Sequence, residues 1–334
     1  MNQLMNTKMV ENLSLPHLHG CTEVITEGSA LKGLRVHIDT QHHKYLHDHT
    51  FGGDCFVPAT QIIELFCETA KWLSTSLESP HLEISHVRNL NIERAIAIEP
   101  GKALTIEIGL TRQVKSDTET IYELAITSDR VNKVGKILGK RVNASARVIV
   151  TSRIQKPESL LLPEMNFTQF SFPSNEFYRF YSPSHGVQFQ SITGNFSVSD
   201  NKEYIYGEYD CGAKEQDYIE GQQSIFMTSP LGYDSCLQYM VFLSRLQRVF
   251  GSLPVGAKDI TILSKHPTEG PCRVLVRRVT MDDTYMEADI IAADSTGQVV
   301  MKAERFRVKK AKFHTTHREE FFQFLEKHRV DKCA

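Results

Sequence analysis

The sequence lacks several features that would place it in a specialised class of protein. Lysine and arginine number 38 and aspartate and glutamate 40, so the formal net charge is −2. A chain this close to neutral carries no overall charge that would favour nucleic acid or an anionic membrane. No window approaches the roughly 18 consecutive apolar residues of a membrane helix. Residues 1–14 are polar and contain no apolar stretch typical of a secretory signal.

Paired cysteines are also missing. The seven cysteines are scattered along the chain, and none of them forms a C-x-x-C pair. This pattern argues against a disulfide scaffold and against a structural zinc site, and it favours a reducing compartment. We therefore expect a cytoplasmic protein. Its hydrophobic fraction of 41% is high enough to build a sizeable core.

What the sequence does contain is one order of elements that occurs twice. In the first half, a strand at 34–40 precedes a turn at 47–58, a helix at 59–76 with apolar residues at three- and four-residue steps, and further strands. The alternating faces of those strands are Leu104, Ile106, Ile108 and Leu110, and then Val142, Ala144, Ala146, Val148 and Val150.

The second half repeats this order. Its expected elements are a strand at 204–209, a turn at 228–232, a largely apolar helix at 233–250 that Gly251 and Pro254 end, strands at 274–279, 285–292 and 298–308, and an amphipathic tail helix at 318–330.

A single apolar helix covered by a curved antiparallel sheet is the layer arrangement of a hot-dog fold. The pattern therefore predicts an α+β chain with two such layers in tandem, a double hot-dog. Two unrelated α+β domains are the alternative. We expect an N-terminal subdomain at 1–155, a proline-containing linker at 156–175 and a C-terminal subdomain at 176–334.

Histidine is the most unusual component of the sequence. Five of the 14 histidines fall between His37 and His49. His49 is followed by Gly53 and Pro58, immediately before the first predicted helix. Glycine lets the backbone approach a ligand closely, and the start of a helix offers unpaired N–H groups. A base beside such donors suits the enolisation of a thioester.

The second helix offers a partner for this base. Asp234 and Gln238 are four residues apart, so they share one helical face. A desolvated carboxyl keeps its proton to higher pH and can donate it, and an amide can hold it in place. A base in one half and an acid in the other half suit an elimination. The simpler alternatives are that Asp234 only caps its helix and that Gln238 is an ordinary helix residue.

These motifs together resemble the dehydratase domain of polyketide synthases, over roughly residues 15–310. The run from His49 to Pro58 matches the family's H-x-x-x-G-x-x-x-x-P motif, and Asp234–Gln238 matches its D-x-x-x-Q/H motif. Leu253-Pro254 resembles a third element. The segment 185–190 matches Y-G-P-x-F-Q in part, because His185 and Val187 replace the family's Tyr and Pro.

The resemblance implies a double hot-dog fold and a hydro-lyase that converts a β-hydroxyacyl thioester on an acyl carrier protein into the α,β-enoyl thioester. It implies His49 as base and Asp234 as acid, supported by Gln238. The substrate would contact Gly53, Pro58, His185, Phe189 and Tyr233.

By the same resemblance, no cofactor or metal takes part, and the substrate is carried on a phosphopantetheine arm. The partners are the carrier protein and other polyketide synthase components, and many members form homodimers. The chain begins with Met and ends soon after the second repeat, which suits either a freestanding enzyme or an excised domain.

Several alternatives remain open from the residues themselves. His42, His43, His47 and His49 could bind a metal, and Cys55 and Cys236 could be reactive thiols rather than apolar filler. A basic set in the second half could be a solvated surface or could dock an acidic carrier protein; it comprises Arg273, Arg277, Arg278, Lys309, Lys310 and Lys312. The same fold could act as an enoyl isomerase, a pyran-forming or product-template-type cyclase, or a non-catalytic binder of acyl chains or carrier protein.

Overall fold

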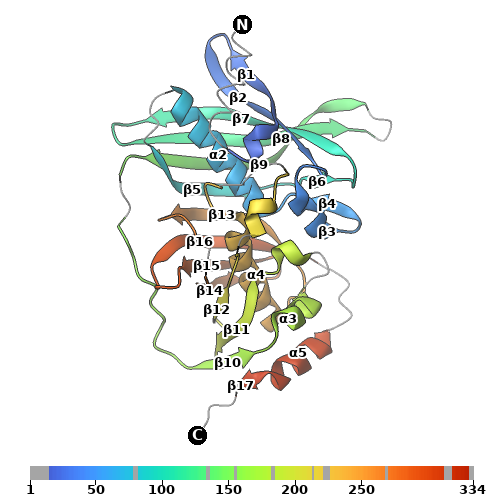
Figure 1. Cartoon of the computed structure of the whole chain (residues 1–334), viewed down its shortest axis with the longest axis vertical. Coiled ribbons are helices and arrows are strands. Elements are labelled where there is room, and N and C mark those ends of the chain that lie inside the picture. Colours follow the sequence, from blue (N-terminus) through green and yellow to red (C-terminus); the bar gives the residue numbers. More distant parts are fainter. Residues whose placement is uncertain are drawn as a thin grey trace. The chain divides into compact units, whose positions relative to one another are not determined.

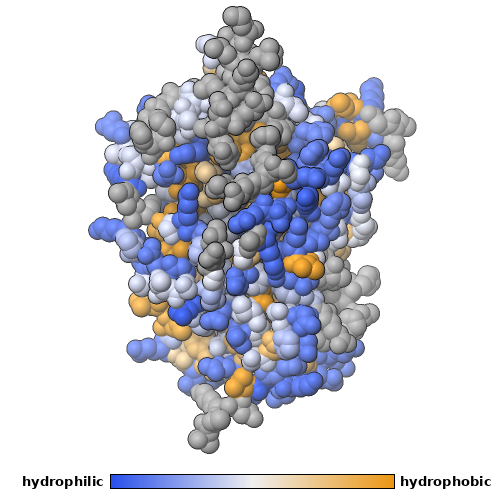
Figure 2. All heavy atoms as spheres, viewed as in Figure 1, coloured by the Kyte–Doolittle hydropathy of each residue, from blue (hydrophilic) through white to orange (hydrophobic). Residues whose placement is uncertain are grey.

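The structure is a computed structural model of the chain. It describes residues 15–77, 82–132, 136–153, 156–181, 185–212, 214–220, 226–267, 270–311 and 318–330. The chain forms two compact units (Figure 1): Met1–Gln155 with Lys214–Pro230, and Lys156–Ala213 with Leu231–Ala334. On the face shown in Figure 2 hydrophilic residues dominate, and apolar residues form only small groups between them.

The first unit is one helix against an antiparallel sheet. Helix α2 (Ala59–Leu77) contacts strands β2, β5, β8 and β9. The strand order is β1 (Cys21–Glu27), β2 (Ala30–Asp39), β7 (Ala103–Lys115), β8 (Glu119–Val131), β9 (Ile137–Thr151) and β5 (Glu83–Ile92). A small second sheet contains β3 (Thr50–Phe51), β4 (Asp54–Phe56) and β6 (Ala97–Ile98), and the short 3₁₀ helices are η1 (His17–Gly20), η2 (Lys44–Asp48) and η4 (Lys214–Asp217).

The second unit repeats this plan around helix α4 (Pro230–Leu246). Its strand order is β13 (Ser252–Ile262), β16 (Val299–Lys310), β15 (Tyr285–Ala293), β14 (Cys272–Met281), β12 (Tyr204–Tyr209), β11 (Ile192–Ser199), β10 (Phe167–Ser171) and β17 (Arg329–Val330). The other helices are α3 (Ser174–Tyr181), η3 (Val187–Phe189) and α5 (Arg318–Lys327).

Both central helices are buried because the sheets and shorter helices cover most of their sides. In α2 the residues expected to face the core, Ile62, Ile63, Phe66, Ala70 and Leu73, are all at most 1% exposed. In α4 the ring of Phe242 stacks on Phe177 and meets Phe196 and Phe321 edge-on. Among the described helices, none has the length and apolar character needed to cross a membrane.

The predicted limits of the second helix, 233 and 250, were wrong at both ends. α4 begins at Pro230, because proline has no N–H to lose at the first helical position and its φ already suits a helix. It ends at Leu246, because Arg248 adopts a φ of 64° and caps the helix. The N–H groups of Arg248 and Val249 bond the carbonyls of Arg245 and Ser244, as in a Schellman motif.

One residue of a predicted strand face, Val142, was assigned to the wrong side of its strand. The β8–β9 register shifts between the pairs Ile126↔Ala144 and Thr127↔Val142, so Asn143 is an extra residue on β9. Beyond such a bulge the inward and outward faces of a strand exchange. Val142 is therefore 37% exposed, whereas Asn143 is buried and accepts a 2.8 Å hydrogen bond from the Ser128 hydroxyl.

Three segments are organised differently from the sequence-based expectation. The segment 156–175, expected as a linker, contains β10, which pairs with β11 inside the second unit. Residues 214–230 are grouped with the first unit although they lie far along the chain. The tail helix α5 ends at Lys327, and residues 329–330 form β17 instead.

A substitution at Gly207 tests the packing of the second unit. A Cβ there would lie 2.3 Å from the Tyr239 ring, whose hydroxyl donates a 2.7 Å hydrogen bond to the Glu208 carbonyl. Gly207→Ala should therefore lower the free energy of unfolding by about 1–3 kcal/mol, as measured by denaturant titration. Gly109→Ala is the matched control, because the nearest atom to its Cβ is 4.0 Å away. Equal stabilities of the two variants would contradict this packing.

Candidate functional site

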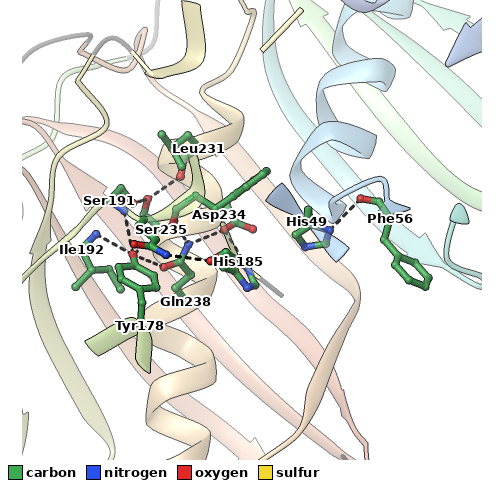
Figure 3. Close-up of polar contacts among 12 residues, drawn as sticks. His49, Phe56, Tyr178, His185, Ser191, Ile192, Leu231, Asp234, Ser235 and Gln238 are labelled. Carbon is green, nitrogen blue, oxygen red and sulfur yellow. Dashed lines mark hydrogen bonds and ion pairs between the residues drawn. The ribbon is translucent and has the colours of Figure 1, made fainter. Parts of the chain in front are cut away.

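A hairpin positions His49. Strands β3 and β4 are joined by Gly52 and Gly53, whose φ values of 63° and 96° suit a two-residue turn with both residues in the left-handed region. This turn places His49 opposite Phe56. The Phe56 N–H donates to the His49 carbonyl at 2.9 Å, and the His49 Nδ1 donates to the Phe56 carbonyl at 2.9 Å (Figure 3).

These contacts decide the protonation of the His49 ring. A carbonyl only accepts hydrogen bonds, so Nδ1 carries the proton and the unprotonated nitrogen of the neutral ring is Nε2. Burial lowers the pKa of His49 to about 4, and the bond to Phe56 only partly opposes this. At neutral pH the ring is therefore a neutral imidazole, the form that can accept a proton.

The other predicted residues of the first unit contribute to its local structure. Gly53 lies at the exposed tip of the hairpin, where its positive φ is what the turn requires. Pro58 is buried, and its carbonyl accepts the Ile62 N–H at 3.1 Å where α2 begins. Cys55 is 1% exposed and burial raises the pKa of its thiol, so it is placed as apolar filler.

Two histidines of the alternative metal site, His42 and His43, contact different groups of Asp39. The Nδ1 of His42 lies 2.9 Å from the Asp39 carboxylate. His43 is 4% exposed, and its Nδ1 lies 3.1 Å from the Asp39 carbonyl. His47 is exposed at the end of η2. Their contacts are those of a hydrogen-bonded turn before His49.

In the second unit, Asp234 and Gln238 are joined directly. Asp234 is the fifth residue of α4, so it lies in the second turn and does not cap the helix. It is 6% exposed, and its Oδ2 accepts a 2.8 Å hydrogen bond from the Gln238 Nε2. The same amide nitrogen donates to the Phe189 carbonyl at 2.8 Å, which fixes the orientation of the amide.

The environment of Asp234 favours its protonated form. Burial raises the pKa of Asp234 to about 7, and the Gln238 N–H, which favours the ionised form, only partly opposes this. A carboxyl with such a pKa can donate a proton near neutral pH. Cys236 on the same helix is fully buried, and burial keeps its pKa high, so its thiol stays protonated.

Tyr178 completes this network and was not predicted. Its hydroxyl donates to the Gln238 Oε1 at 2.8 Å and accepts the N–H groups of Ser191 and Ile192 at 2.9 and 3.0 Å (Figure 3). Burial raises the pKa of the phenol, so it keeps its proton. Because Tyr178 comes from α3, 60 residues before Gln238, no local motif pointed to it.

The remaining predicted residues of the second unit gather around Asp234. The His185 Nε2 lies 3.6 Å from the Asp234 Oδ2, an ion-pair distance. The Phe189 ring is fully buried and lies edge-on to His185 with 5.9 Å between the centroids. Tyr233 precedes Asp234 in α4 and is 4% exposed. Of the two residues predicted as base and acid, His49 in the first unit is thus a neutral imidazole and Asp234 in the second unit has a pKa raised to about 7.

Comparison with family models gives two matches. Residues 21–128 match a model described as polyketide synthase dehydratase domain, and residues 169–315 match one described as polyketide synthase dehydratase N-terminal domain. His49 lies in the first matched region, and Asp234 and Gln238 lie in the second. No curated protein sequence matches the chain.

Solved structures show the same double hot-dog fold. The dehydratase domain from the CurF module of curacin polyketide synthase aligns with a TM-score of 0.66 at 17% identity, covering 87% of this chain and 98% of that one. A trans-AT polyketide synthase dehydratase domain from Brevibacillus brevis gives 0.65 at 16% identity, covering 84% and 94%. A trans-acyltransferase polyketide synthase enoyl-isomerase gives 0.58 at 14% identity, covering 82% and 98%.

The bond from Gln238 to Asp234 can be tested by titration. Gln238→Leu removes the N–H that favours the ionised carboxylate, so we expect the pKa of Asp234 to rise above about 7. The measurement is the ¹³C NMR titration of the Asp234 carboxyl in wild-type and variant protein. An unchanged or lower pKa in the variant would show that Gln238 does not hydrogen-bond the carboxylate.

Proposed function

The chain belongs to the polyketide synthase dehydratase family, and we propose that it removes water from a β-hydroxyacyl thioester held on an acyl carrier protein, giving the α,β-enoyl thioester. The observation that carries this proposal is the opposite shift of two pKa values. Burial lowers that of His49 to about 4 and raises that of Asp234 to about 7. Between these values the base is neutral and the acid is protonated, as an elimination requires.

In the proposed reaction, the His49 Nε2 removes the proton on the carbon next to the thioester carbonyl. The electron pair of that C–H bond forms the C=C bond, and the C–O bond to the hydroxyl breaks. Asp234 donates its proton to the departing oxygen, so water leaves. N–H groups at the start of α2 would stabilise the charge that builds on the thioester oxygen. The overall elimination is redox-neutral and needs only a base and an acid, so we propose no cofactor.

The other second-unit residues support the acid in this proposal. Gln238, held by Tyr178 and the Phe189 carbonyl, fixes the orientation of the Asp234 carboxyl. His185 replaces the Tyr of the family motif and lies at ion-pair distance from the same carboxyl. We propose that His185, Phe189 and Tyr233 contact the acyl chain, with Gly53 and Pro58 shaping the approach to His49.

Docking of the carrier protein on the basic set in the second unit stays a prediction. Arg277 pairs with Asp289 at 2.5 Å, and Arg278 lies 3.5 Å from Glu203, so two of its charges are partly neutralised. Lys312 lies outside the described residues. The carrier protein is proposed because a thioester of this kind needs a carrier. The compartment that we propose for the reaction is the cytoplasm.

An enoyl isomerase is the second candidate, since one structural neighbour carries that name. Isomerisation moves a proton between two carbons of one chain and expels no oxygen. The protonated Asp234 favours dehydration, because a leaving hydroxyl needs an acid in addition to the base.

Substitution of the two residues tests the proposal. His49→Gln and Asp234→Asn should each lower kcat/KM by about 10²–10⁴-fold, with the far-ultraviolet circular dichroism spectrum unchanged. Activity is measured by mass spectrometry as loss of one water from the carrier-bound β-hydroxyacyl chain. His47→Gln is the matched control, because this exposed histidine lies two residues before His49 and should retain full activity. Wild-type activity in both test variants would refute the assignment.

The pH dependence supplies an independent test. Activity requires neutral His49, so kcat/KM should rise as the pH rises through about 4. It also requires protonated Asp234, so kcat/KM should fall as the pH rises through about 7. The profile should therefore be a bell with its plateau between these values. A profile that keeps rising above pH 7 would contradict the role of Asp234 as acid.

A further inference from the structure

Helix α2 carries two buried glutamates that the proposed reaction does not use. Glu64 and Glu68 lie one helical turn apart, and both are fully buried. A carboxylate is costly to bury unless hydrogen bonds replace its water. The partners of the two side chains therefore indicate what each of them holds in place.

Glu64 accepts hydrogen bonds from a single short segment. Its Oε1 accepts the Met227 N–H, and its Oε2 accepts the Thr228 N–H at 2.8 Å and the Thr228 hydroxyl at 2.5 Å. Residues 226–229 belong to neither a helix nor a strand, so their N–H groups have no partners in a regular ladder. Burial, and then the charge of the neighbouring Glu68, raise the pKa of Glu64 to about 7, and the donors from Thr228 and Met227 oppose this shift.

Other contacts hold the same segment. The Phe226 ring packs 5.5 Å from the His17 ring and 6.1 Å from the Tyr218 ring. The Ser229 hydroxyl donates to the Glu215 carboxylate at 2.9 Å. Glu64 is the acceptor for the backbone N–H groups, and its bonds therefore set the path of the main chain here.

The segment leads directly into the helix of the proposed acid. Thr228 lies two residues before Pro230, where α4 begins, and Asp234 follows within the second turn of that helix. An α-helix is rigid over two turns, so a change at its entry changes the position of the side chains that follow. Misplacement of a reacting group by about 1 Å can lower a rate about 10²-fold.

We propose that Glu64 is a positioning residue for the dehydration: its side chain holds Met227 and Thr228, and so fixes the path of the main chain that enters α4, the helix that carries Asp234. This inference rests on the proposed function. Glu64 touches no reacting atom and acts only through the chain that precedes α4.

Glu68 provides a control on the same helix. Its carboxylate accepts the N–H groups of His17 and Leu18 at 3.0 and 3.1 Å, and the His17 Nδ1 lies 2.9 Å from it. Glu68 is thus buried like Glu64, and it accepts about as many hydrogen bonds from a short segment of the chain. It holds η1 near the start of the described chain, and this segment does not lead into α4.

The test compares Glu64→Gln with Glu68→Gln in the full chain. Each change places an NH₂ group against N–H donors, so both variants should lose stability. Glu64→Gln should lower kcat between about tenfold and a hundredfold and leave KM within about twofold. Glu68→Gln should leave both constants within about twofold. Glu64→Asp, which keeps both oxygens, should recover part of kcat.

Amide hydrogen exchange gives a readout that does not depend on activity. It should accelerate at residues 226–234 in Glu64→Gln and at residues 17–18 in Glu68→Gln. If Glu64→Gln does not fold, Thr228→Val removes one of the three bonds with little change of shape, and it should lower kcat with KM unchanged.

Two results would overturn the inference. One is an equal loss of kcat in both glutamine variants, which would show that Glu64 affects activity only through the overall stability of the fold. The other is unchanged exchange at residues 226–234 in Glu64→Gln. A wild-type chain that dehydrates no carrier-bound substrate would instead refute the proposed function, and the exchange comparison would still decide whether Glu64 holds Met227 and Thr228.

Discussion

Desolvation on two buried helices is the constraint on which the rest of the structure depends. Because each unit wraps its sheet around one helix, a polar side chain on that helix loses its water and must find protein partners. Asp234 meets this demand through Gln238, and Glu64 through the N–H groups of Met227 and Thr228. A pKa raised from 3.8 to about 7 corresponds to roughly 4 kcal/mol against ionisation of Asp234. The fold itself therefore keeps the proposed acid protonated.

Desolvation also explains the protonation state of the proposed base, because it shifts the pKa of an imidazole in the opposite direction to that of a carboxyl. Burial disfavours the charged form of any group, so it lowers the pKa of an imidazole while raising that of a carboxyl. His49 is neutral for this reason, and the hairpin of β3 and β4 fixes which of its nitrogens carries the proton. The pairing of His49 with Phe56 thus decides which ring nitrogen of this histidine can accept a proton.

Local patterns could be predicted from the sequence, because they depend on neighbours a few residues apart. The three- and four-residue spacing of Ile62, Ile63 and Phe66 predicted α2, and the spacing of Asp234 and Gln238 predicted their hydrogen bond. Partners far apart along the chain could not be predicted. Tyr178 reaches Gln238 from 60 residues away, and Glu64 meets Thr228 across 164 residues. The bulge at Asn143 could not be predicted either, because the alternation of apolar and polar residues contains no signal for an extra residue.

The central claim is that burial makes His49 a neutral base and Asp234 a protonated acid over the same pH range. The most direct measurement is an NMR titration of the wild-type chain that follows the His49 imidazole and the Asp234 carboxyl together. At a pH between about 4 and about 7, the account predicts a neutral imidazole and a protonated carboxyl in the same sample. An imidazolium together with an ionised carboxylate in that range would contradict it.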